Sequence, residues 1–204
     1  MYIIVSYKPQ QKNGMLMIDV QKAVLNLYPS VSKLPAFTQK AIFYFLRRLF
    51  YEKEINEFLE KNRDIQGIEF ARKAMEHLNF GYTVSNKDKE NIPSNGKVII
   101  IANHPLGGLD SFALLDLVYS VRRDVRIVAN RVLNAIEPIA PMLLPVDNMT
   151  GSISKDSFKA MIKALDNEEA VIFFPSGEVS RARPTGIRDT VWRSGFLHLA
   201  KSAD

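Results

Sequence analysis

The stretch that decides the fold reads KVIIIANHPLGGLDSFALLDLVYSV and covers residues 97–121. It begins with an uninterrupted apolar run through Ile101, which is typical of a β-strand buried on both faces of a sheet. A turn that contains Gly107 and Gly108 follows, and SFALLDLVYSV is predicted to be a helix. A strand that leads through a glycine-rich turn into a helix predicts an α/β fold.

Strands and helices continue to alternate after this stretch. VRIVAN, MLLPV and AVIFFP predict three further strands at residues 125–130, 142–146 and 170–175, and Pro145 restricts its strand to a sheet edge or a strand end. SKDSFKAMIKAL predicts an amphipathic helix over residues 154–165, with Ser154 as its N-cap. We therefore expect the fold class α/β, with a largely parallel mixed sheet flanked by helices and an N-terminal helical region.

The chain changes character near residue 82. Three helical patterns precede this point, at Met15–Tyr28, Thr38–Lys61 and Ile68–Phe80. Gly81 is expected to end the last of them, and Tyr82–Ser85 alternates like a short strand. We predict a disordered extension at 1–14, an N-terminal helical region at 15–81 and the α/β core at 82–204.

The composition limits the function classes. The chain has 204 residues, of which 47% are hydrophobic, so it can bury the core of one ordinary domain. It has no cysteine, which excludes a disulfide framework, a thiolate metal site and a cysteine nucleophile. A net charge of +5 favours an anionic partner such as a membrane surface, a nucleic acid or a phosphorylated substrate.

One segment of the helical region combines apolar and basic residues. The segment at residues 36–61, AFTQKAIFYFLRRLFYEKEINEFLEK, begins with a strongly apolar part. Lys33 lies just before this part, and Lys40, Arg47 and Arg48 lie along it. Such a segment can lie in a membrane interface and bind anionic lipid. A helix packed on its own domain explains the same apolar residues equally well, so both interpretations stay open.

Two polar sequences stand at predicted strand ends. In α/β sheets, sites form beyond the carboxyl ends of the strands, so His104 and Pro175 are expected on one edge of the sheet. His104 is suited to be a general base, and Asp110 to hold its second ring nitrogen and stabilise the imidazolium, while Gly107 and Gly108 allow the chain to turn back. The simpler alternative is that Asp110 or Ser111 only caps the next helix.

The remaining candidate motifs are weaker. The glycine pair lacks the lysine of a P-loop and the third glycine of a dinucleotide site. His77 and His198 read as ordinary helix residues, and neither has metal-ligand spacing to another histidine, so no metal is predicted.

The sequences NHPLGGLD and FPSGEVSR together resemble two motifs of the glycerolipid acyltransferase family, of the lysophospholipid acyltransferase type. The resemblance runs from about Asn91 to the C-terminus and is strongest to the bacterial hemolysin-like branch, which includes O-acyltransferases of ornithine and glycine lipids. It implies transfer of an acyl group from a thioester of acyl carrier protein or coenzyme A to a lipid hydroxyl, with no cofactor.

The resemblance also implies residue roles. His104 would take the hydroxyl proton, Asp110 would orient His104, and backbone N–H groups near Gly177 would stabilise the oxyanion. Arg181 and Arg183 would bind an anionic substrate or carrier group. The implied substrate contacts are Asn103, Gly107, Gly108, Pro175, Ser176, Gly177, Glu178 and Arg181.

The sequence departs from the family pattern at several positions. The spacing is His-x5-Asp where His-x4-Asp is common, and Ser176, Glu178 and Val179 stand where the second motif has Glu, Thr and Arg. The phosphatidic-acid enzymes carry an acidic-Arg pair where this chain has Asp147 and Asn148. We therefore expect a lyso-aminolipid acceptor, with Arg181 as partner of its carboxylate, and keep 1-acylglycerol-3-phosphate as the alternative.

Other function classes stay open. A lipid hydrolase would use the same His–Asp pair on water, although no Gly-x-Ser-x-Gly sequence is present. A basic membrane-binding module without catalysis is a further alternative, whereas no motif supports a nucleic-acid binder. We expect a cytoplasmic protein, bound peripherally to the inner face of the cell membrane. Because LAKSAD ends the sequence directly after a predicted helix, we also expect a C-terminally truncated core that lacks a strand.

Overall fold

The computed structural model describes residues 10–12, 15–146, 153–184 and 186–203. The strands are β1 (Gln10–Lys12), β2 (Met15–Met17), β3 (Val98–Ile101), β4 (Val125–Asn130), β5 (Leu143–Val146), β6 (Ala170–Phe173), β7 (Arg181–Arg183) and β8 (Gly186–Arg188). The α-helices are α1 (Val20–Leu27), α2 (Ala36–Leu49), α3 (Glu52–Lys61), α4 (Ile68–His77), α5 (Asn86–Lys89), α6 (Gly108–Tyr119), α7 (Lys155–Asp166) and α8 (Gly195–Ala203). Short 3₁₀ helices are η1 (Pro29–Lys33), η2 (Arg131–Ala135) and η3 (Glu137–Met142).

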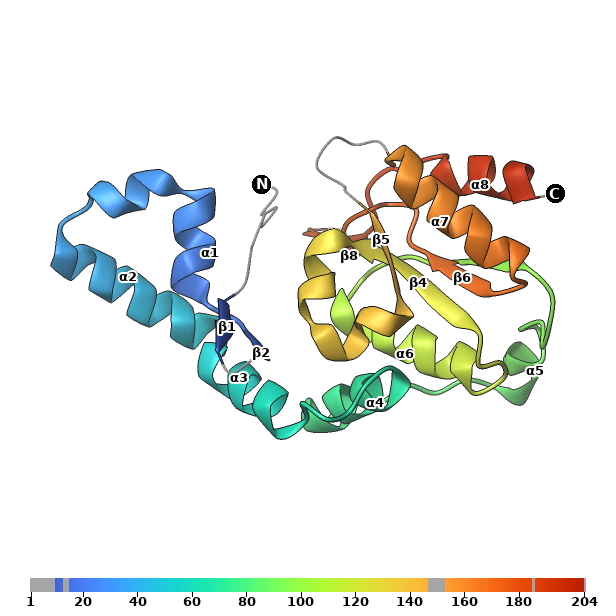
Figure 1. Ribbon diagram of the computed structural model, residues 1–204, viewed down its shortest axis with the longest axis horizontal. Helices are drawn as coiled ribbons and strands as arrows, with labels where there is room; N and C mark the ends of the chain where they lie inside the picture. The colour runs from blue at the N-terminus through green and yellow to red at the C-terminus, as the bar shows by residue number, and fades with distance from the viewer. Residues whose placement is uncertain (1–9, 13–14, 147–152, 185, 204) are drawn as a thin grey trace.

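A parallel sheet of four strands, in the order β3-β6-β4-β5, forms the centre of the fold. Figure 1 shows α6 and α4 on one side of this sheet and α7 and α8 on the other. The predicted α/β class is confirmed, and the central sheet is wholly parallel. Two antiparallel hairpins, β1-β2 and β7-β8, lie outside it.

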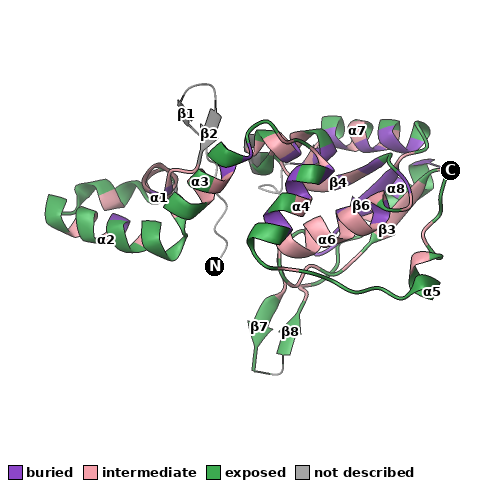
Figure 2. Cartoon of the chain, turned by 90° about the horizontal axis from the view of Figure 1, so that it is seen from below, coloured by how far each residue is buried: buried purple, intermediate pink, exposed green. Residues whose placement is uncertain are grey.

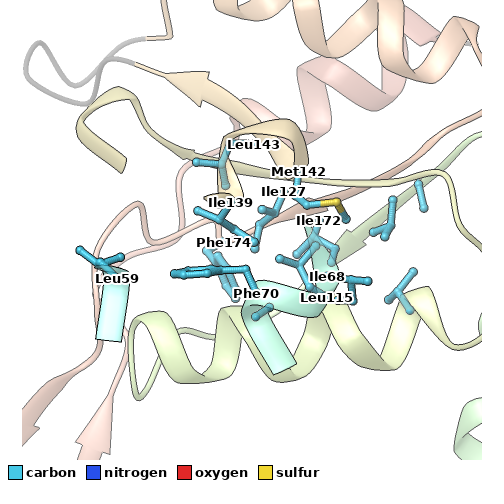
Figure 3. Close-up of a cluster of buried hydrophobic side chains, with 14 residues drawn as sticks. Leu59, Ile68, Phe70, Leu115, Ile127, Ile139, Met142, Leu143, Ile172 and Phe174 are labelled. Carbon is cyan, nitrogen blue, oxygen red and sulfur yellow. The ribbon is translucent and has the colours of Figure 1, made fainter. Parts of the chain in front are cut away.

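The alternation of side chains along the strands creates a separate hydrophobic cluster on each face. The cluster shown in Figure 3 lies on the α4 and α6 face and includes Ile127 from β4 and Ile172 from β6. The cluster on the α7 and α8 face takes the next residue of β6, Phe173, together with Met161 and Leu199. The carboxyl ends of the strands are thus lined by apolar side chains on both faces.

The apolar run that opens the core stretch forms an edge strand. β3 pairs only with β6 among the described strands, and its residues are half-buried or exposed. The expectation that it is buried on both faces is therefore wrong, and β6 is the strand whose residues are all buried. β5, which contains Pro145, lies at the opposite edge, where proline does not interrupt the pairing.

The N-terminal region differs from the prediction in four places. Met15–Met17 form β2 rather than the first turn of a helix. The predicted helix Thr38–Lys61 is divided into α2 and α3 at Tyr51, which has a φ of 51°. Asn79, at a φ of 48°, takes the left-handed position that was expected for Gly81. Tyr82–Ser85 do not form a strand. Of the predicted extension 1–14, residues 1–9 and 13–14 lie outside the described residues.

α2 exposes much of its apolar surface. Phe43 is buried, whereas Phe37, Tyr44 and Phe45 are exposed to 75%, 73% and 64%. Figure 2 shows α1 and α2 extending away from the sheet, with α2 largely exposed. Among the described residues, no helix combines the length and the apolar content needed to cross a membrane.

Candidate active site

His104 lies where the chain leaves β3 and turns towards α6. Because β3 and β6 are parallel, their carboxyl ends meet at one edge of the sheet. At that edge the ring of His104 stacks on the ring of Phe174, with centroids 4.0 Å apart and planes at 22°. The structure thus brings the two sequences that follow β3 and β6 into direct contact.

Asp110, in the first turn of α6, holds the His104 ring. Its Oδ1 lies 2.8 Å from His104 Nδ1, and its Oδ2 accepts a hydrogen bond of 2.7 Å from the N–H of Leu106. Since a carboxylate only accepts hydrogen bonds, this contact selects the tautomer of the neutral imidazole that has its proton on Nδ1 and its lone pair on Nε2. This is the arrangement that a general base requires.

The turn between these two residues needs a glycine. Gly107 has a φ of +72°, and a Cβ at this position would lie 3.3 Å from Val179. Both the backbone conformation and the close contact disfavour a side chain. The longer spacing of His-x5-Asp is therefore compatible with a direct bond between the two side chains. Gly108 begins α6.

A second carboxylate, Asp189, holds the main chain at the same histidine. It directly follows β8, and its Oδ1 accepts hydrogen bonds from the N–H of His104, at 3.2 Å, and from the hydroxyl of Ser180. Its Oδ2 accepts a bond of 2.7 Å from Nε1 of Trp192. The N–H of Ser180 donates to the carbonyl of His104 at 2.7 Å, which closes the network.

Hydrogen bonding keeps Asp189 ionised. Partial burial raises the pKa of Asp189, but the bonds from Ser180, Trp192 and the His104 N–H outweigh it, so this pKa lies below its ordinary value. The sequence analysis missed this residue. The hint in the sequence is a lone acidic residue within the basic segment RARPTGIRDTVWR.

The second motif forms a tight turn after β6. Pro175 and Ser176 are buried, and the hydroxyl of Ser176 donates to the carbonyl of Glu178 at 2.8 Å. Gly177 has a φ of +67°, and its N–H donates to the carbonyl of Phe174 at 3.0 Å. The Gly177 N–H is therefore engaged within its own turn.

Charged residues surround the mouth of the site. Arg181 lies on β7, and its guanidinium contacts the carboxylate of Glu178 at 3.1 Å. Burial raises the pKa of Glu178, yet bonds from Thr190 and Arg181 and the charges of Arg181 and Arg193 lower it below its ordinary value. Arg193, which the sequence analysis did not single out, lines the cavity beside His104 together with Glu178.

The cavity has a volume of about 650 Å³, and mostly apolar side chains line it. This size is within the range of small-molecule sites. His104, Pro175 and Gly177 border it, and the amino end of α6 reaches it at Gly108 and Ser111. A helix amino end carries partial positive charge, so it can stabilise an anionic oxygen there.

The other predicted residues have varied positions. Asn103 precedes His104 and is exposed. His77 stacks on Phe58 in the helical region, whereas His198 of α8 lines the cavity. Asp147 and Asn148 lie outside the described residues. Within the described ranges, no group of three or more His, Asp or Glu side chains could hold a metal ion.

Two comparisons with known proteins indicate the same family. The profile of a family described as acyltransferase matches residues 24–204. Two curated proteins named lyso-glycine lipid O-acyltransferase, from Phocaeicola vulgatus and Bacteroides thetaiotaomicron, are each 31% identical to this chain over 91% of its length. The chain spans 64% and 66% of the length of these two relatives. No solved structure matches it.

Proposed function

This chain belongs to the acyltransferase family, and from that premise we propose that it transfers a fatty acyl group from an acyl thioester to the hydroxyl of a lyso-lipid. The observation that carries the proposal is the His104–Asp110 pair at the edge of a cavity lined by apolar side chains. A histidine base supports proton transfer, and an apolar cavity suits hydrocarbon chains.

The reaction needs no nucleophile from the protein. Nε2 of His104 takes the proton of the acceptor hydroxyl as its oxygen attacks the thioester carbonyl carbon. Asp110 stabilises the imidazolium that forms. The N–H groups at the start of α6 stabilise the oxyanion, and the carbon–sulfur bond then breaks. The proton passes from His104 to the leaving sulfur, so the products are an ester and a free thiol.

The donor is an acyl thioester of acyl carrier protein or coenzyme A. Both carriers are anionic, and the exposed Arg183 and Arg188 of the β7-β8 hairpin offer them positive charge. This hairpin begins beside the site, because Ser180 and Asp189 at its two ends both bond to His104. The carrier would then lie next to the reacting carbonyl.

The acceptor that we propose is a lyso-aminolipid, an amino acid with an N-linked hydroxy fatty acyl chain. Its carboxylate needs one positive partner, and Arg193, which lines the cavity, is better placed to provide it than Arg181, which does not line it. The names of the two relatives support a lyso-glycine lipid.

The α2 surface supports a place on the membrane. It exposes Phe37, Tyr44 and Phe45 alongside Lys40 and Arg48, which is the composition of an interfacial helix. We propose that α2 lies on the anionic, cytoplasmic face of the cell membrane, where the lipid acceptor is found.

Competition between two acceptors tests the proposed acceptor. The protein is given an acyl thioester with equal amounts of an N-(3-hydroxyacyl)glycine and a lysophosphatidate. We expect a higher kcat/KM for the aminolipid. A preference for lysophosphatidate of about tenfold, or 1.4 kcal/mol in the transition state, would overturn this acceptor. Release of free fatty acid without transfer would instead indicate a hydrolase.

A further inference from the structure

The cavity beside His104 is lined from both faces of the sheet. Adjacent residues of a strand point to opposite faces. On β4, both Val128 and its neighbour Ala129 line the cavity. So do Phe173, the last residue of β6, and Phe174, which directly follows it. The cavity therefore extends over the carboxyl edge of the sheet rather than into one face.

The lining residues fall into two groups that match the two hydrophobic clusters. The first group belongs to the α4 and α6 face and includes Phe112, Leu115, Ile127, Ala129, Ile139 and Leu143. We call this part of the cavity the α6 arm. The second group belongs to the α7 and α8 face and includes Val128, Val146, Ile153, Phe158 and Phe173. We call this part the α8 arm.

His104 lines the same cavity as both groups of residues. Its ring stacks on Phe174, which directly follows β6. A bond between two molecules, each with a hydrocarbon chain, can form there only if the two chains leave the reacting atoms in different directions. Two apolar arms that diverge from one base satisfy this condition.

We propose that the two arms hold two hydrocarbon chains at once, the donor acyl chain in the α6 arm and the fatty chain of the acceptor in the α8 arm. The proposal rests on the proposed function. The α6 arm is the more deeply buried, with Leu115 and Ile127 exposed to only 1% and 2%. A hydrocarbon chain suits so buried an arm. Both chains meet this condition, so the position of the acceptor headgroup decides which chain lies in which arm.

The α8 arm adjoins the proposed acceptor headgroup. Arg193, Ser194 and Gly195 line the cavity at the start of α8, and a carboxylate bound by Arg193 would lie at the entrance of this arm. Gly195 packs directly on two walls of this arm, because a Cβ at this position would lie 3.2 Å from Cδ1 of Ile153 and 3.8 Å from the ring of Phe173. The headgroup position therefore assigns the acceptor chain to the α8 arm.

Adjacent residues of β4 provide a matched test. Ala129→Phe fills the α6 arm, and Val128→Phe fills the α8 arm, while both changes add a ring to the same strand. The kcat/KM of each folded variant is measured with thioesters of increasing chain length and, separately, with N-(3-hydroxyacyl)glycines of increasing chain length. Ser111→Leu and Gly195→Val provide a second pair if the phenylalanine variants do not fold.

We expect each variant to lose activity on the long chains of one substrate only. Ala129→Phe should disfavour long donors and Val128→Phe long acceptors, by about fourfold for each methylene that loses its site. The proposal is overturned if both variants shift the preferred chain length of the same substrate to shorter chains. It is also overturned if neither variant has an effect, or if Ala129→Phe affects the acceptor and Val128→Phe the donor. Absence of transfer by the wild-type protein would instead contradict the proposed function.

Discussion

Asp189 is the residue whose role depends most on long-range structure. It bonds to the main chain of His104, from which it is separated by 85 positions in sequence. It does not line the cavity. We therefore infer that Asp189 is a positioning residue, which fixes the turn that carries the proposed base, while Asp110 holds the ring of that base.

Substitution of Asp189 should lower kcat and leave the KM values almost unchanged. Asp189→Ala removes the acceptor for three donors, so we expect kcat to fall about 100-fold, the effect of a small misplacement of a catalytic group, with little change in either KM. Asp189→Asn keeps one oxygen acceptor and should recover most of this loss. The control is Ile187→Ala on the same hairpin, where the side chain is 60% exposed. A fall in kcat for Asp189→Ala that Asp189→Asn does not relieve at all would contradict this role.

The contact between His104 and Asp110 could be predicted because its signal is local. His104 and Asp110 are six positions apart, on either side of two glycines, and one turn determines their contact. Asp189 and Arg193 could not be predicted in the same way, because their positions depend on how the segment after β6 folds back onto β3. For the same reason the sequence analysis named Arg181 as the headgroup partner and did not single out Arg193, which lines the cavity.

At the scale of the secondary-structure elements, one buried arginine holds together the amino ends of three strands of the central sheet. Arg122 is 4% exposed and bonds to both carboxylate oxygens of Asp124, at 2.8 and 2.7 Å. It also donates to the carbonyl of Gly96, at 2.8 Å, and to that of Glu168. It therefore connects the segments that enter β3, β4 and β6.

Arg122→Met should destabilise the fold. The change removes the side-chain donor to the carbonyls of Pro93, Gly96 and Glu168 and to the Asp124 carboxylate. We expect it to lower the free energy of unfolding by about 3 kcal/mol. Arg123→Met is the matched control, because Arg123 is exposed and contacts mainly Tyr119, so its loss should stay within about 1 kcal/mol. Urea unfolding measures both, and equal values for the two variants would rule out the special role of Arg122.

The wrong predictions for the α2–α3 region and for β3 have one cause, which is that both features depend on structure that the local sequence pattern does not contain. The apolar periodicity of α2 continues into α3, so it indicates one helix, and the break at Tyr51 needs a left-handed residue that periodicity does not reveal. The run VIII in β3 has the same composition as that of a central strand, and its edge position follows from strand order alone. The predictions were correct for strands β4, β5 and β6 and for helix α7, because their sequence patterns are clear and are bounded by turns.

At the scale of the whole molecule, α2 should direct binding to anionic membranes. Lys40→Glu with Arg48→Glu should weaken binding to vesicles that contain phosphatidylglycerol by about thirtyfold at low salt, since each lost cation contributes about 1 kcal/mol. The double change Lys155→Glu with Lys159→Glu on α7 carries the same charge and should have a much smaller effect. Vesicle flotation measures both, and equal losses would show that α2 has no special part.

Acid should destabilise the molecule through its bonded carboxylates. The hydrogen bond from Arg122 holds the pKa of Asp124 below its ordinary value, and the pKa of Asp189 is also lowered. Carboxylates with a lowered pKa contribute stability above their unfolded pKa of about 3.9, and this is lost as pH falls through the lower folded value. The free energy of unfolding should therefore fall below about pH 5. Asp124→Asn should reduce this slope, and an unchanged slope would contradict the assignment.

The most direct measurement is transfer of a labelled acyl group from a thioester to an N-(3-hydroxyacyl)glycine by wild-type protein and by His104→Ala. We predict transfer by the wild type, a loss of about 1,000-fold or more in His104→Ala, and a strong loss in Asp110→Asn with the fold intact. His77→Ala, in the helical region, should keep full activity. Near wild-type turnover by folded His104→Ala protein would contradict the mechanism.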